Sequence, residues 1–214
     1  MAVLQDMRVL ELLASRICHD LISPVGAIGN GLELLEEMGA QVGEEAVKLI
    51  GHSSEQASRR LKLFRVCYGA AGADGNLTCD DVLTTARDYL AGSRVSLSWE
   101  AAPLKSIPDL PKGTAKVLLN AVLIAVEALV HGGTINVLRE CNTLSIQAEG
   151  RGAGQRSEAW PALNGDIPTS ELSARSIHPH VTRCFADHYG VKIEWEQPSE
   201  DRLDMRLTYA IAQT

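Results

Sequence analysis

Apolar residues recur at spacings of three and four along the first 38 residues of the chain. The repeat predicts a long amphipathic helix over residues 4–38 with one apolar seam. Gly39 follows directly and marks the expected end of this helix. The residues of the predicted seam are Leu10, Leu13, Ile17, Leu21, Val25, Ile28, Leu32 and Leu35.

A second run of the same kind begins at Gly43, followed by two glutamates at positions that favour a helix N-terminus. Its seam contains one polar position and consists of Val47, Ile50, Ser54, Ala57, Leu61, Phe64 and Tyr68. Two long helices joined by a few residues predict an antiparallel hairpin. A hairpin cannot bury both faces alone, so we expect a homodimer that forms a four-helix bundle. The alternative is that the rest of the chain covers the second face.

The pattern changes after the hairpin. Residues 69–76 are rich in glycine and alanine, which predicts a boundary between a helical hairpin at 1–70 and a second domain at 76–214. The second domain alternates element types, which predicts an α+β protein whose C-terminal part is an α/β sandwich with helices on one side of a mixed sheet. Helices are expected at 79–91, 109–131 and 179–189, a short helix near Trp160, and strands at 95–100, 134–140, 143–149, 191–196 and 202–211.

One histidine lies off the seam of the first helix. His19 is two residues from both Ile17 and Leu21, about 200° around a helix from each, so it is expected to face solvent. Pro24 has no backbone N–H and leaves the carbonyl of Asp20 without its helical partner. An exposed histidine beside a carboxylate, one turn before a proline, is a candidate site. The alternative is an ordinary surface histidine next to a kink.

Composition narrows the class of protein. A net charge of -7 over 214 residues argues against a nucleic-acid partner. The five cysteines are odd in number and form no C-x-x-C pair, so neither a disulfide framework nor a zinc knuckle is indicated. The most apolar run, 117–130, is too short to span a bilayer, and the N-terminus lacks the pattern of a secretory signal. We therefore expect a cytoplasmic protein with no membrane partner.

The order of elements and three motifs resemble the transmitter core of sensor histidine kinases. Residues 19–25 are similar to the kinases' phospho-acceptor box, in which a histidine and an acid precede Thr or Asn and then proline. Residues 116–120 resemble the start of their asparagine-box helix. Residues 149–152 follow two predicted strands, where the kinases carry an Asp-x-Gly-x-Gly nucleotide motif. The resemblance implies a C-terminal domain like the kinases' ATP-binding domain.

The departures from the kinases concern nucleotide binding. Ile124 falls where the kinases place a metal-coordinating asparagine, and Ala148 falls where they place an adenine-binding aspartate. Residues 173–178 contain no glycine where a second glycine-rich motif is expected. A histidine-bearing hairpin joined to a kinase-like domain that does not bind ATP resembles the ChpT-type histidine phosphotransferases.

This resemblance implies that His19 accepts a phosphoryl group from a receiver-domain aspartate and passes it to response regulators. An imidazole is mostly uncharged at neutral pH, which leaves a ring nitrogen free to attack. Asp20 would orient that imidazole, and Ser23 takes the Thr/Asn position. The implied donor is the receiver of a CckA-like hybrid kinase, the acceptors are CtrA-like or CpdR-like regulators, and Mg²⁺ is expected on the receiver, with no cofactor on this chain. The residues expected to dock the receiver are Arg16, Ile22, Arg59, Lys62 and Arg65.

Two other interpretations stay open at this point. One is an ATP-dependent sensor histidine kinase core with a diverged pocket, which tight ATP binding would favour. The other is a structural protein that dimerises or sequesters a partner and carries an unreactive His19. The absence of any acid-labile phosphate on His19 would favour that interpretation.

Overall fold

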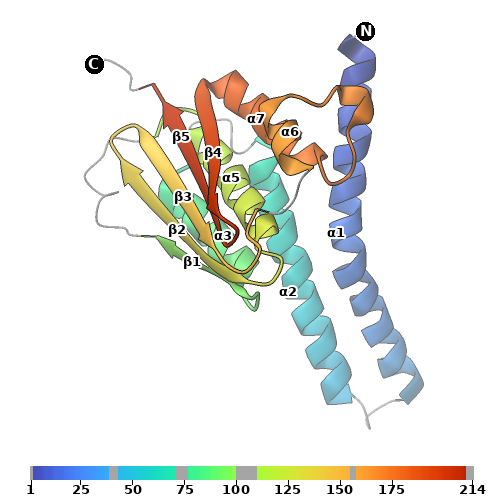
Figure 1. Ribbon diagram of the computed structural model, residues 1–214. Coiled ribbons are helices and arrows are strands. Elements are labelled where there is room, and N and C mark those ends of the chain that lie inside the picture. Colours follow the sequence, from blue (N-terminus) through green and yellow to red (C-terminus); the bar gives the residue numbers. More distant parts are fainter. Residues whose placement is uncertain (1, 39–42, 71–76, 100–109, 155–157, 211–214) are drawn as a thin grey trace.

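The computed structural model describes residues 2–38, 43–70, 77–99, 110–154 and 158–210. Two long helices, α1 (Ala2–Met38) and α2 (Gly43–Cys67), run side by side as the predicted hairpin (Figure 1). They approach closely at Gly31, where a Cβ atom would lie 2.6 Å from Cγ1 of Ile50. The helical periodicity predicted the ends of both helices to within a few residues. Helix α1 continues through Pro24 without a break.

The C-terminal part is a five-stranded sheet with helices on one side, as expected (Figure 1). The strand order is β1-β2-β3-β5-β4, in which β1 pairs parallel with β2 and every other pair is antiparallel. The mixed sheet confirms the predicted α+β class. The strands are β1 (Val95–Trp99), β2 (Gly133–Glu140), β3 (Thr143–Glu149), β4 (Val191–Ser199) and β5 (Arg202–Tyr209), and the helical segments are α3 (Cys79–Leu90), α5 (Thr114–Ala128), α6 (Ala159–Asn164), η3 (Thr169–Glu171) and α7 (Ile177–Tyr189).

Local capping sets two of the helix starts. Thr78 and Asp81 form a reciprocal capping box at α3, where the sequence predicts a helix start. The prediction for α5 was wrong at both ends, because the helix begins at Thr114 and ends at Ala128 instead of covering 109–131. Gly113, just before α5, has a φ of 79°, a left-handed conformation that interrupts any helix running in from Pro111.

The α/β part and the hairpin share one hydrophobic core. Helices α3, α5 and α7 cover one face of the sheet, and buried residues at the end of α2, such as Leu63 and Cys67, belong to the same cluster. Ile17 and Leu21 of α1 pack against it from the other side. The predicted boundary between domains lies largely at 71–76, outside the described residues, and its position stays a prediction. The upper half of the hairpin is nonetheless fixed to the α/β part by continuous packing.

The predicted apolar seams of the hairpin divide into two sets. Ala57 and Phe64 are buried inside the chain. A second set faces outward. On α2, Ser53 is buried, whereas the predicted seam residue Ser54 is exposed. The exposed seam residues are Leu10, Val25 and Leu32 on α1 and Val47 and Leu61 on α2. In the described part of the chain, no helix combines the length and hydropathy that crossing a bilayer requires.

Candidate functional site

His19 lies on the surface of α1, with 88% of its side chain exposed. The ring nitrogen Nδ1 is 3.2 Å from Oδ1 of Asp20, the next residue along the chain. A carboxylate accepts hydrogen bonds only, so this contact places the proton of a neutral imidazole on Nδ1 and leaves the lone pair on Nε2. Because the ring is exposed, Nε2 is accessible from solvent.

Ser23 and Ile22 follow His19 by one helical turn, and both are exposed. Ile22 has 69% of its surface accessible, which is unusual for so large an apolar side chain beside a reactive group. Arg16 lies one turn before His19 but, unlike His19, is largely covered. Its side chain is only 16% exposed and pairs with Glu127 of α5. Its predicted docking role stays a prediction, but the structure gives this guanidinium a partner inside the chain.

The predicted basic residues of α2 occupy different environments. Lys62 and Arg65 are exposed. Arg59 is partly covered and forms an exposed i, i+4 ion pair with Glu55 at 3.1 Å. Arg60, which the sequence did not single out as a site residue, donates from Nη1 to the backbone carbonyl of Asp20. This carbonyl is the one that Pro24 leaves without a helical donor.

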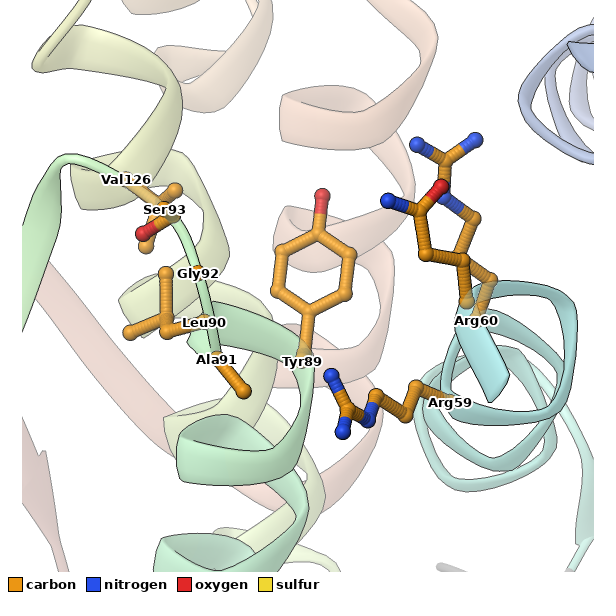
Figure 2. A pocket seen from close by; sticks show the side chains of 9 residues that line it. Arg59, Arg60, Tyr89, Leu90, Ala91, Gly92, Ser93 and Val126 are labelled. Carbon is orange, nitrogen blue, oxygen red and sulfur yellow. The ribbon is translucent and has the colours of Figure 1, made fainter. Parts of the chain in front are cut away.

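A pocket of about 260 Å³ separates α2 from the turn between α3 and β1. Figure 2 shows Arg59 and Arg60 along one wall, the turn residues and Val126 along the other, and the ring of Tyr89 between them. Burial raises the pKa of Tyr89, and the negative charges of Glu127 and Asp20 raise it further. The positive charges of Arg60 and Arg16 lower this pKa only in part, so the pKa of Tyr89 stays above its ordinary value.

A polar network lies buried where the hairpin meets the α/β part. Glu127 accepts from Arg16 and lies 3.3 Å from Nδ1 of His178, whose Nε2 lies 3.2 Å from Oδ1 of Asn120. Asn120 in turn donates to the backbone carbonyl of Cys67 at the end of α2. The sequence carried one signal of this network, since Asn120 and Glu127 interrupt the apolar run 117–130, lie seven residues apart and so share one face of the helix.

Two positions that align with the kinases' nucleotide motifs hold buried apolar side chains. Ile124 is 2% exposed, and Ala148 is fully buried in the middle of the sheet. Ile177, at the start of α7, is also fully buried. Within the described ranges, no group of three or more His, Cys, Asp or Glu side chains is placed to hold a metal ion.

The chain thus combines a helical hairpin that exposes His19 with an α/β layer packed against that hairpin. Residues 79–201 match the family model described as the histidine phosphotransferase C-terminal domain, and the chain belongs to this family. The chain is 38% identical to the protein phosphotransferase ChpT of Brucella abortus (strain 2308) over 195 residues, covering 89% of this chain and 90% of that protein. A solved bacterial phosphotransferase superposes with a TM-score of 0.77 at 30% identity, covering 94% of this chain and 96% of the other.

Proposed function

We propose that the protein relays a phosphoryl group between receiver domains without using ATP. His19 accepts the group from an aspartyl phosphate of one receiver and passes it to an aspartate of a response regulator. The observation that carries the proposal is the pairing of an exposed imidazole with a carboxylate at Nδ1. This pairing leaves Nε2 as the nucleophile, directed away from Asp20.

The transfer balances without further reactants. The Nε2 lone pair forms an N–P bond while the P–O bond to the donor aspartate breaks, and that bond's electron pair leaves with the aspartate carboxylate. The product is a phosphoimidazolium whose proton stays on Nδ1, where it is donated to the carboxylate of Asp20. The second receiver reverses these events. Phosphoryl transfer of this kind depends on in-line positioning and charge neutralisation, so we expect the receiver to supply the acceptor aspartate and Mg²⁺.

The surface around His19 supports docking of a receiver. Ile22 offers an apolar contact three residues from the imidazole, and the hydroxyl of Ser23 lies one turn on, exposed to a docked partner. The exposed cations Lys62 and Arg65 and the partly exposed Arg59 add positive charge on α2. Such charges accelerate association with an acidic partner.

Two features of the chain support the absence of ATP chemistry and a dimeric state. Ile124 offers no oxygen or nitrogen ligand to a nucleotide-bound metal ion, and Ala148 offers no side-chain hydrogen bond to an adenine. Val25 and Leu32 are exposed seven residues apart on α1, and Val47 and Leu61 are exposed on α2. These apolar stripes are complementary to the hairpin of a second copy in a four-helix bundle.

A reconstituted transfer assay tests the proposal. A receiver domain carrying labelled aspartyl phosphate is mixed with the wild type or with His19→Ala, and a parallel sample contains labelled ATP alone. We expect label to move from the receiver to the wild type, not to the variant, and no label to arrive from ATP. Labelling from ATP would identify a kinase. Absence of label from every receiver tried would support a structural protein instead.

A further inference from the structure

The backbone carbonyl of Asp20 lacks its usual hydrogen-bond donor within α1. Pro24 is part of the helix and has no N–H, so the usual donor four residues further along the chain is missing. The proline ring also pushes that carbonyl outward. Pro24 is itself buried, which fixes this irregularity at the face of α1 that looks toward the rest of the chain. The carbonyl therefore needs a donor from another element.

Arg60 supplies that donor from α2. Its Nη1 donates to the carbonyl oxygen of Asp20 across a sequence separation of 40 residues. The position of Arg60 is set by its neighbours, because Ala57 and Leu63 on the same helix are buried. A guanidinium carries five N–H donors in a rigid plane, so the bond to a carbonyl is directional. The side chain extends along the wall of the pocket in Figure 2.

The residue held by Arg60 is also the residue that orients the nucleophile. The backbone of Asp20 accepts from Arg60, while its carboxylate lies 3.2 Å from Nδ1 of His19. Without Arg60 the backbone at Asp20 can shift, which would displace the imidazole and weaken its contact with the carboxylate. Because misplacement of a reacting group by about 1 Å costs on the order of a hundredfold in rate, the anchor is well placed to control transfer.

We propose that Arg60 is a positioning residue for phosphoryl transfer: it takes the carbonyl that Pro24 leaves free and so fixes the turn of α1 that carries Asp20 and His19. The inference rests on the proposed relay through His19. It differs from a docking role, since a docking residue would act on the affinity for the receiver. It also differs from a purely stabilising hydrogen bond, since the loss would then appear in unfolding alone.

The experiment is a double-mutant cycle between Arg60 and Pro24. With Ala at position 24 the helix regains an N–H for the carbonyl of Asp20, so the anchor becomes redundant. We expect Arg60→Gln to lower kcat for transfer from a phosphorylated receiver by about tenfold or more, with KM changed less than about twofold. In the Pro24→Ala background the same substitution should lower kcat by less than about twofold. Arg60→Lys, which keeps a charged N–H donor but not the planar guanidinium, should recover part of the rate.

Gln56→Ala is the matched control, because Gln56 lines the same pocket but its side chain contacts His52 instead of the carbonyl of Asp20. It should leave both KM and kcat unchanged. The proposal is overturned if Arg60→Gln changes only the unfolding midpoint or only KM, or if its effect on kcat is the same in both backgrounds.

A second measurement does not depend on any receiver. Imidazole ¹⁵N chemical shifts report which nitrogen of His19 carries the proton. We expect the Nδ1–H form in the wild type, a shift toward Nε2–H in Arg60→Gln, and recovery in the Pro24→Ala, Arg60→Gln double variant. If no receiver phosphorylates the wild type but this pattern holds, the relay fails while the anchoring by Arg60 stands. Shifts unaffected by Arg60→Gln would overturn the anchoring.

Discussion

Arg16 of α1 and Glu127 of α5 form an ion pair that joins the hairpin to the α/β part. Their side chains are 16% and 22% exposed, so both charges are largely removed from water. Arg16 lies one helical turn before His19, which places this junction directly beneath the candidate phospho-acceptor. The α/β part therefore supports the helix that carries His19.

We expect Glu127→Ala to lower the free energy of unfolding by about 3 kcal/mol, because the change leaves the Arg16 guanidinium buried without its partner. Urea unfolding followed by circular dichroism gives this value. Glu55→Ala is the control, since Glu55 pairs with Arg59 at the surface and should matter by less than about 0.5 kcal/mol. Equal losses in the two variants would show that the Arg16–Glu127 pair stabilises the fold no more than a surface ion pair does.

Stability should also depend on pH through His178. Its ring is fully buried, and both nitrogens lie near oxygen acceptors, on Glu127 and Asn120. Burial lowers the pKa of His178, partly offset by the carboxylate of Glu127, while Arg16 lowers it further. The folded state therefore takes up a proton less readily than the unfolded state, whose histidine titrates near pH 6.5.

The sign follows directly. Above about pH 6.5 His178 is unprotonated in both the folded and the unfolded state, and the free energy of unfolding is at its full value. As the pH falls below about 6.5, the unfolded state binds the proton first, so the free energy of unfolding decreases. One such group changes the free energy of unfolding by at most about 1.4 kcal/mol per pH unit. We expect His178→Gln to flatten the profile between pH 7 and 5. Burial also lowers the pKa of His180, so some slope should persist. An unchanged profile would contradict the assignment.

The sequence predicted the elements well where one side-chain pattern decides the structure. The ends of α1 and β3 follow from periodicity and turn residues alone. The start of α5 did not, because the left-handed conformation of Gly113 overrides the helix signal of Pro111. Likewise, the division of the hairpin's apolar seam into an inner and an outer set depends on packing against α2 and the sheet.

The candidate site also has some features that the sequence predicts and others that only tertiary packing sets. The exposure of His19 follows from its angle to the seam, and the free carbonyl of Asp20 follows from the chemistry of proline. The donor for that carbonyl, Arg60, comes from 40 residues away and is set by tertiary packing. The same holds for the contact of His178 with Glu127, across 51 residues, which no local pattern encodes.

The exposed seam residues allow the proposed dimer to be tested by substitution. Val25→Glu combined with Leu32→Glu should convert a dimer into a monomer, because both charges would enter the core of the bundle. Light scattering during gel filtration at several concentrations gives the mass. Leu34→Glu is the control: Leu34 is similarly accessible but lies about 180° around α1 from Val25. A wild type that is monomeric at every concentration would refute the predicted four-helix bundle.

The basic residues of α2 should act on encounter with the receiver. Lys62→Glu with Arg65→Glu should raise KM for a receiver about tenfold and weaken the dependence of the rate on salt, since charge steering is screened beyond about 10 Å at 0.1 M salt. The rate measured at saturating receiver should change little. Lys192→Glu, an exposed change on the edge strand β4, is the matched control and should leave KM as it is.

Asp20 should determine which nitrogen of His19 reacts. A carboxylate can only accept from Nδ1–H, whereas the amide of Asp20→Asn can donate to Nδ1 and so favour the tautomer with its proton on Nε2. That tautomer has no lone pair at the attacking nitrogen, so we expect kcat for transfer to fall by about 10- to 100-fold with little change in KM. Glu36→Gln, an equivalent change at an exposed position of the same helix, should have no effect. If Asp20→Asn transfers at the wild-type rate, the carboxylate does not set the tautomer and the nucleophile acts without an orienting partner.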